Sequence, residues 1–214
     1  MFGVAADVIL AYRGGMSVTS PSVLFDLADA HGGLFTTAEA KAAGLSDRVL
    51  SYYHRRGDLD RMSHGIYRFV NYPFHRHQDL IVAVLWTPAG SAISHETALG
   101  VYGLADAMAN LIHVTVPSAF RGKLAGVMVH HAELDATERT VWDDVPVTTI
   151  ERTLIDVATT SSPDLARTAC RQALDAGMTT RPRLGDAIEA AGGDPTAVRA
   201  VLGVGRRRAP GEAQ

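Results

Sequence analysis

The sequence predicts an α+β protein with two domains, and three observations support this prediction. The chain has 214 residues, of which 47% are hydrophobic and 20% charged, a composition typical of globular proteins with buried cores. Residues 20–70 hold short helical patterns and then two strand-like runs, whereas residues 75–205 mix longer helical patterns with three strand-like runs. The residues between them, around 71–73, break both patterns and are typical of a linker.

The bulk composition and the two ends narrow the class of protein. No run of about 18 or more apolar residues occurs, so we expect no membrane contact. The single cysteine, Cys170, excludes an intrachain disulfide framework and a cysteine zinc site, and it favours a reducing cytoplasm. We expect residues 1–19 to be an N-terminal extension, with Met16 as an alternative start to Met1, and residues 206–214 to be a flexible tail.

The first domain, residues 20–70, begins with two predicted helices. Ser20-Pro21 is typical of a helix start, because a capping hydroxyl is followed by proline, and Gly32-Gly33 ends this helix. Thr36 and Glu39 have the spacing of a capping box, which predicts a short helix that Gly44 closes.

A third helix follows almost at once. Ser46 is expected to cap a helix over 47–56 and Gly57 to end it, so a tight glycine-containing turn joins two helices in a helix-turn-helix. At about 100° per residue, Leu50 and Tyr53 fall on the side that packs on the preceding helix. The opposite side presents side chains suited to a DNA major groove, where arginine pairs with guanine or phosphate and hydroxyl groups reach phosphates or base edges: Arg48, Ser51, Tyr52 and Arg55.

Two strand-like runs over 59–70, turning at Gly65, predict a β-hairpin directly after this helix. A hairpin in that position makes the domain a winged helix-turn-helix, and three of its side chains would lie near DNA phosphates, namely Arg61, His64 and Arg68. Residues 41–68 hold six basic against three acidic side chains, whereas residues 71–205 hold ten against fifteen. DNA binding is the favoured interpretation, and a winged helix that docks on protein is the alternative.

The second domain, residues 75–205, is predicted to combine a small β-sheet with several helices. Thr148 and Glu151 have capping-box spacing and predict the start of a clearly amphipathic helix. The predicted strands lie at 111–116, 126–131 and 145–148, and the other predicted helices at 75–86, 95–104, from 163 to about 177, 184–191 and 196–202.

Several of these segments resemble AbiEi-type antitoxins, the regulators of abortive-infection (type IV) toxin–antitoxin systems. The resemblance is carried in the first domain by residues 33–40, 44–46, 56–61 and 64–68, of which the Gly-Ile-Tyr-Arg run at 65–68 is the most specific, and more diffusely in the second by 94–99, 113–117 and 145–156. It implies a bifunctional protein. The winged helix would repress its own operon at operator DNA, and the second domain would be an effector that counteracts a partner nucleotidyltransferase toxin.

The residues indicate no enzyme and no cofactor. A nucleotidyltransferase needs a Gly-Ser followed by an Asp-x-Asp or Asp-x-Glu pair that holds Mg²⁺, and no such pair follows Gly90-Ser91 at a usable distance. A nuclease-like acidic triplet occurs only at 39–41, where capping explains it. Ser94-His95-Glu96 has the residue types of a hydrolase, but adjacent helical residues diverge and do not form a relay.

No metal site is expected either. His75 and His77 are candidate ligands, but single solvated histidines are more common. His130 and His131 lie on a predicted strand and point to opposite faces, so they cannot easily bind one ion together. Arg152 and Asp156 are predicted to form an ordinary surface pair. The alternative function is a winged-helix transcriptional regulator whose second domain binds a ligand or dimerises, with no toxin involved.

Overall fold

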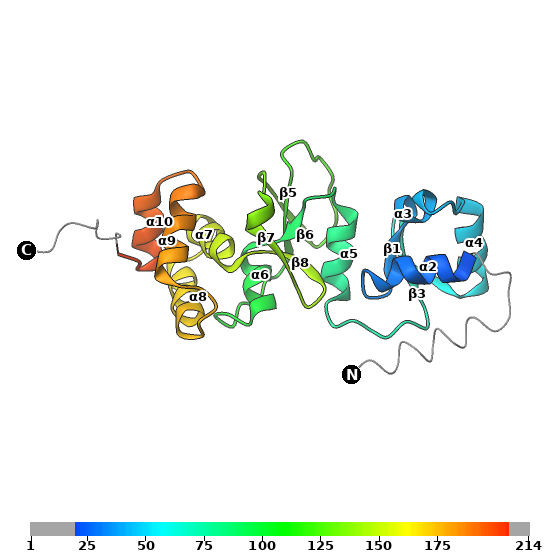
Figure 1. The fold of residues 1–214 in the computed structure, drawn as a ribbon, viewed down its shortest axis with the longest axis horizontal. Helices are drawn as coiled ribbons and strands as arrows, with labels where there is room; N and C mark the ends of the chain where they lie inside the picture. Colours follow the sequence, from blue (N-terminus) through cyan, green and yellow to red (C-terminus); the bar gives the residue numbers. More distant parts are fainter. Residues whose placement is uncertain (1–19, 206–214) are drawn as a thin grey trace, which may run out of the picture. The chain divides into compact units, whose positions relative to one another are not determined.

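The computed structural model describes residues 20–205 and confirms the α+β class. The chain forms two compact units that divide between Thr87 and Pro88 (Figure 1). We predicted a linker at 71–73, earlier than this division. The division lies later because helix α5 (Gln78–Trp86) packs against all three strands of the first unit's sheet and does not join the second unit. Residues 1–19, residues 206–214 and the side chain of Ser20 lie outside this description, and so do the predictions made for them. No helix within residues 20–205 has the length and apolar character needed to cross a membrane.

The first unit contains the predicted helix-turn-helix and the predicted hairpin. Helices α2 (Ser20–Asp29), α3 (Thr37–Ala42) and α4 (Asp47–Arg56) precede the hairpin of β2 (Leu59–Ser63) and β3 (Ile66–Phe69). A third strand, β1 (Leu34–Thr36), was not predicted; it pairs antiparallel with β3, so the sheet order is β1-β3-β2. Its three residues are too few to show an alternating pattern.

Local sequence signals explain the turns of this unit. The Thr36–Glu39 capping box is present at the start of α3, and Gly57 ends α4 in the left-handed conformation. Ser46 occupies the N-cap position of α4 but makes no side-chain capping bond. Gly33 is required where the Tyr72 ring approaches, because a β-carbon there would lie 2.5 Å from the ring. Aromatic contacts complete the core, with the ring centroids of Phe25 and Phe69 5.9 Å apart.

The second unit contains a mixed five-stranded sheet. Its strands are β4 (Ala92–Ile93), β5 (Ile112–Val116), β6 (Val127–His131), β7 (Arg139–Trp142) and β8 (Val145–Thr148), in the order β6-β5-β4-β8-β7. The pairs β5–β6 and β4–β8 are parallel, whereas β4–β5 and β7–β8 are antiparallel. Only β5, β6 and β8 were predicted. β4 is too short for a pattern, and β7 at the sheet edge is mostly exposed.

Five α-helices complete the second unit. α6 (His95–Tyr102) packs on β5 and α7 (Ile150–Thr160), and α7 is in turn covered by α8 (Pro163–Asp175), α9 (Arg181–Ala190) and α10 (Pro195–Leu202) (Figure 1). A short 3-10 helix, η1 (Ala136–Glu138), precedes β7. Cys170 is buried, as its apolar helical stripe predicts.

The predicted capping box of Thr148 with Glu151 is wrong by one residue. Strand β8 continues through Thr148, whose hydroxyl is buried and lies 2.7 Å from that of Thr153. Thr149 is the N-cap of α7, and its hydroxyl accepts a hydrogen bond from the Arg152 amide. Glu151 is therefore not a capping residue, and its buried carboxylate accepts a 2.6 Å hydrogen bond from Thr179.

The capping box at α3 gives the first unit an acid-sensitive contact. A hydrogen bond from His31, 2.9 Å away, lowers the pKa of Glu39 to about 2, and hydrogen bonds from the amide and hydroxyl of Thr36 act in the same direction. Because the folded pKa lies below the ordinary value, Glu39 stabilises the fold above about pH 4.5, and this contribution is lost as the pH falls toward about 2.

We expect Glu39→Gln to lower the melting temperature at pH 7 and to reduce its dependence on pH. The uncharged amide keeps a hydrogen-bonding side chain but cannot gain stability from ionisation. Melting curves of both proteins between pH 7 and pH 3 measure this effect, and the curves should converge on acidification. A constant offset across that range would contradict an ionic contribution.

Candidate functional site

Helix α4 has two opposed faces. Leu50 and Tyr53 are buried in the core of the first unit, as predicted. The four side chains predicted to contact DNA are all exposed and extend over two turns: Arg48, Ser51, Tyr52 and Arg55. This arrangement follows from helical periodicity, because residues spaced by three or four lie on one side. The geometry therefore presents two guanidinium groups and two hydroxyl groups on one solvent-facing surface.

Arg56 is a member of this surface that the sequence analysis did not assign. Its guanidinium lies 5.7 Å from the centre of the Tyr52 ring and 2.5 Å from the Asp58 carboxylate. The Tyr52 ring, which is 46% exposed, also meets Tyr53 edge-on with centroids 5.4 Å apart. The Arg56 guanidinium also lies 5.5 Å from the centre of the Tyr53 ring, so Arg56 contacts both tyrosine rings. The spacing of four between Tyr52 and Arg56 was the available signal.

The hairpin presents two of its three predicted contact residues to solvent. Arg61 and His64 are exposed, and the Arg61 guanidinium lies 3.1 Å from His64 Nδ1. Arg68 differs from the prediction: it is half-buried on the central strand β3, and its guanidinium donates a 2.8 Å hydrogen bond to the Tyr72 carbonyl. Arg68 therefore ties the sheet to the following loop.

The turn of the hairpin is anchored to the start of α3. Gly65 has a φ of 75°, a conformation that favours glycine, and its carbonyl accepts hydrogen bonds from both the amide and the hydroxyl of Thr37, at 2.7 and 3.2 Å. The hairpin tip is thus connected directly to the helix-turn-helix.

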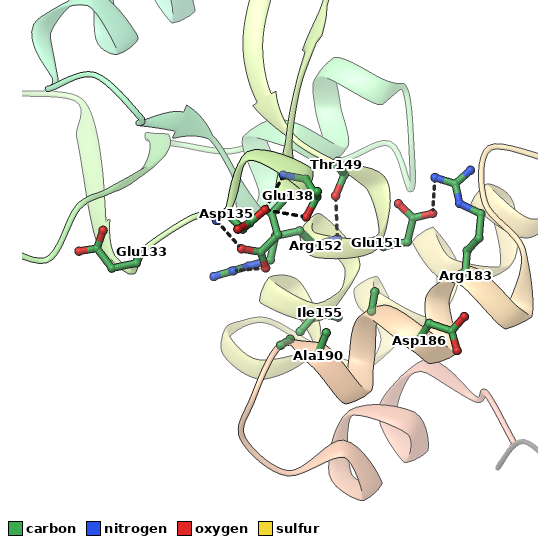
Figure 2. Close-up of a pocket in the computed structure, with 13 residues that line it drawn as sticks. Glu133, Asp135, Glu138, Thr149, Glu151, Arg152, Ile155, Arg183, Asp186 and Ala190 are labelled. Atoms are coloured by element: carbon green, nitrogen blue, oxygen red, sulfur yellow. Dashed lines mark hydrogen bonds and ion pairs between the residues drawn. The ribbon is translucent and has the colours of Figure 1, made fainter.

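The second unit contains a pocket of about 560 Å³ formed by η1, α7, α9 and adjoining loops (Figure 2). Its charged lining is mainly acidic, with five carboxylates against two guanidinium groups: Glu133, Asp135, Glu138, Glu151, Asp186, Arg152 and Arg183. The Arg183 guanidinium lies 3.0 Å from the Glu151 carboxylate and the Arg152 guanidinium 2.7 Å from that of Glu138, so both positive charges are paired within the pocket lining. A pocket with this lining favours a cationic group as its occupant.

Arg152, which lines this pocket, forms a network with Glu138 and Asp156, at 2.7 and 2.8 Å. Arg152 and Asp156 pair as predicted, but the prediction that they lie on the surface is wrong, because the two side chains are only 14% and 10% exposed. Burial raises the pKa of Asp156, and the adjacent Arg152 opposes this shift. The sequence did not reveal the burial because η1 reaches the network from outside the helix.

Three histidines lie together in the second unit. They include His130 but not His131, and neither His75 nor His77. His95, His113 and His130 each offer a ring nitrogen within 4.8 Å of the other two; we call them the histidine cluster. His131 is exposed on β6 beside His130, so the prediction that the two cannot act together is consistent with the structure. Burial lowers the pKa of His95 to about 3 and that of His130 to about 4, with neighbouring histidines adding to both shifts.

The Ser94-His95-Glu96 run does not form a relay, as predicted. Ser94 Oγ lies 2.9 Å from His95 Nδ1, but Glu96 contacts His113 and Ser161 instead of His95. In the first unit the ring centroids of His75 and His77 are 6.0 Å apart. The histidine cluster escaped prediction because its members come from the start of α6, from β5 and from β6.

The comparisons with known proteins agree with the resemblance in the first unit. Residues 22–70 match the family model described as "Transcriptional regulator, AbiEi antitoxin". The fold is similar to the crystal structure of the RV2827C protein from Mycobacterium tuberculosis, with a TM-score of 0.51 and 17% sequence identity over 91% of this chain and 84% of that one. Identity this low shows a shared fold only. The comparison with curated proteins found no match.

Proposed function

We propose, on the premise that residues 22–70 form an AbiEi-type regulator domain, that this chain is a cytoplasmic antitoxin that represses its own operon. The observation that carries the proposal is the exposed face of α4 beside the hairpin. Arg48, Ser51, Tyr52 and Arg55 would enter a major groove of operator DNA, while Arg61 and His64 on the wing would contact flanking phosphates. The partner would be a nucleotidyltransferase toxin, and the chain itself would not be an enzyme.

Contacts made by the wing should add affinity without sequence preference. We expect Arg61→Ala to weaken binding to operator and unrelated DNA by similar factors, and to lower the magnitude of the salt-dependence slope by about 1. Fluorescence anisotropy at several salt concentrations measures both quantities. Arg171→Ala, which removes an exposed positive charge from the second unit, is the matched control. A loss confined to operator DNA would instead assign Arg61 to base recognition.

The acidic pocket of the second unit is where we place the contact with the toxin. Toxins of this class handle nucleotides and need basic side chains for the phosphates, and the carboxylates around the pocket would complement such a surface. Glu133 and Asp186 are exposed members of the lining on different segments, so they can be changed without disturbing the buried Arg152 network.

Growth of cells that express the neighbouring nucleotidyltransferase gene tests the antitoxin function. Wild-type chain should restore growth, and so should the Arg48→Ala/Arg55→Ala double variant, because neutralisation would not require DNA binding. The Glu133→Lys/Asp186→Lys double variant should fail, whereas Asp175→Lys, a charge reversal at the exposed end of α8, should rescue. A harmless neighbour, or a toxic one that full-length chain does not rescue, would contradict the antitoxin function for that gene pair.

A second candidate function rests on the same pocket. Its volume of about 560 Å³ falls within the range typical of small-molecule sites, so a winged-helix regulator controlled by a ligand also fits the structure. The acidic lining would select a cationic ligand. In that case operator binding would respond to the ligand, and no neighbouring gene would be toxic.

A further inference from the structure

The histidine cluster of the second unit has no role in the proposed functions. We propose that His95, His113 and His130 bind one divalent transition-metal ion, with zinc as the preferred ion. The inference does not depend on the antitoxin proposal, because it rests on side chains remote in sequence from the DNA-binding face. The ion would connect the start of α6 to the parallel strand pair β5–β6.

The distances place the three rings close to the geometry that zinc needs. A ring nitrogen from each histidine lies within 4.8 Å of the other two. A tetrahedral zinc ion with Zn–N bonds of about 2.0–2.1 Å holds its nitrogen ligands about 3.3 Å apart. The rings of His95 and His130 are stacked with centroids 3.6 Å apart, and the centroids of His113 and His130 lie 5.1 Å apart. Binding one ion would therefore require the stacked rings of His95 and His130 to rotate about their side-chain bonds so that a nitrogen of each faces it.

Neighbouring side chains supply the outer shell that metal-binding histidines usually have. Glu96 Oε2 lies 2.9 Å from His113 Nδ1, and that nitrogen also lies 3.2 Å from His130 Nε2, so the carboxylate borders the position of the proposed ion and can orient the His113 ring. Ser94 Oγ lies 2.9 Å from His95 Nδ1 and accepts a 2.8 Å hydrogen bond from the Thr115 hydroxyl. Two of the three histidines are therefore oriented by a second group.

The backbone at His95 adds an independent observation. Its φ is +53°, a left-handed conformation that is costly for a residue with a β-carbon. Of the five non-glycine residues with positive φ in residues 20–205, His95 alone is buried, with 4% of its surface exposed. Strained backbone of this kind is concentrated at ligand-binding sites. Here it directs a ring inward at the first turn of α6, toward the strand that carries His113.

The donor atoms determine which ions fit. Imidazole nitrogens suit zinc, copper and nickel, whereas magnesium and calcium require mainly oxygen ligands. Three histidines leave a fourth tetrahedral position, which water or the nearby Glu96 carboxylate would fill. Among these ions zinc accepts the tetrahedral arrangement without a preference of its own for square-planar geometry.

Zinc titration of the full-length chain tests the site. After treatment with a chelator and its removal, zinc is titrated in competition with a chromophoric chelator, and the melting temperature is recorded. We expect one ion per chain and a higher melting temperature. His95→Asn, His113→Asn and His130→Asn should each weaken zinc binding by at least about 100-fold, and Glu96→Gln by about 10–100-fold. His131→Asn, on the same strand as His130 but exposed, should bind zinc like wild type.

Cobalt binding to the wild-type chain tests the site without any substitution, so the result does not depend on whether a variant folds. Tetrahedral Co²⁺ with histidine ligands gives strong visible absorption, whereas adventitious surface binding in water gives weak octahedral bands. His95→Asn is the most conservative variant, because asparagine tolerates the left-handed conformation. The absence of 1:1 binding, an octahedral cobalt spectrum, or equal weakening in His130→Asn and His131→Asn would each overturn the proposal.

Discussion

Replacing Arg152 with methionine should lower the free energy of unfolding of the second unit by about 3 kcal/mol. The guanidinium pairs with Asp156 and Glu138, and removing it would leave two carboxylates facing each other in a largely buried setting. Methionine preserves most of the side-chain volume, so the loss reports the uncompensated charge rather than a cavity. Urea denaturation of a Trp86→Phe background measures the effect, because Trp142 of the second unit is then the one tryptophan of the chain.

Arg167→Met is the matched control for this prediction. Arg167 also pairs with a carboxylate, that of Asp164 at 3.0 Å, but the two side chains are 53% and 92% exposed. Exposed pairs of this kind contribute about 0–1 kcal/mol, so the control should change stability little. Equal losses in Arg152→Met and Arg167→Met would show that burial of the network does not matter.

Replacing Arg48 or Arg55 with alanine should weaken operator binding by about 1–3 kcal/mol each, or about 5–150-fold, if these side chains read bases. Both guanidinium groups extend from the exposed face of α4. Anisotropy titrations with the chain's own upstream DNA and with a scrambled duplex, at one salt concentration, separate base recognition from general attraction to phosphate. The loss should be larger for the operator than for the scrambled duplex.

Two further variants serve as controls for that experiment. Arg171→Ala, with the same change in net charge but in the second unit, should bind operator normally. Tyr52→Phe keeps the ring that Arg56 contacts and removes only the hydroxyl, so it tests the predicted polar contact of Tyr52. If both Arg48→Ala and Arg55→Ala bind like wild type, α4 is not the recognition helix.

The first unit could be predicted from the sequence because its signals are local. The capping box at Thr36, the glycine stop at Gly57 and the apolar spacing of Leu50 and Tyr53 each involve residues a few positions apart. The same periodicity identified the exposed face of α4. We predicted that Arg68 would contact DNA because local patterns do not show β1. With β1 present, Arg68 lies on the central strand of the sheet.

The second unit was less predictable because its sites are assembled from distant segments. The histidine cluster joins residues from α6, β5 and β6, and the Arg152 network joins η1 to α7. Neither set has a characteristic spacing in the sequence. The capping-box error at Thr148 has a related cause, since Thr148 belongs to a strand that lies between the two-residue strand β4 and the edge strand β7, where it pairs with Arg139. Tertiary pairing, rather than local preference, decides where that helix begins.

The bond between the hairpin turn and the start of α3 has a thermodynamic consequence for recognition. Because Thr37 holds the Gly65 carbonyl through both its amide and its hydroxyl, the hairpin is already fixed against α3, the first helix of the helix-turn-helix that carries α4, before any encounter with DNA. A free hairpin would lose conformational entropy on binding, whereas this one has lost it during folding. The tether therefore preorganises the hairpin. The hairpin is less able to adapt to duplexes of different shape, but binding a duplex of matching shape costs less conformational entropy.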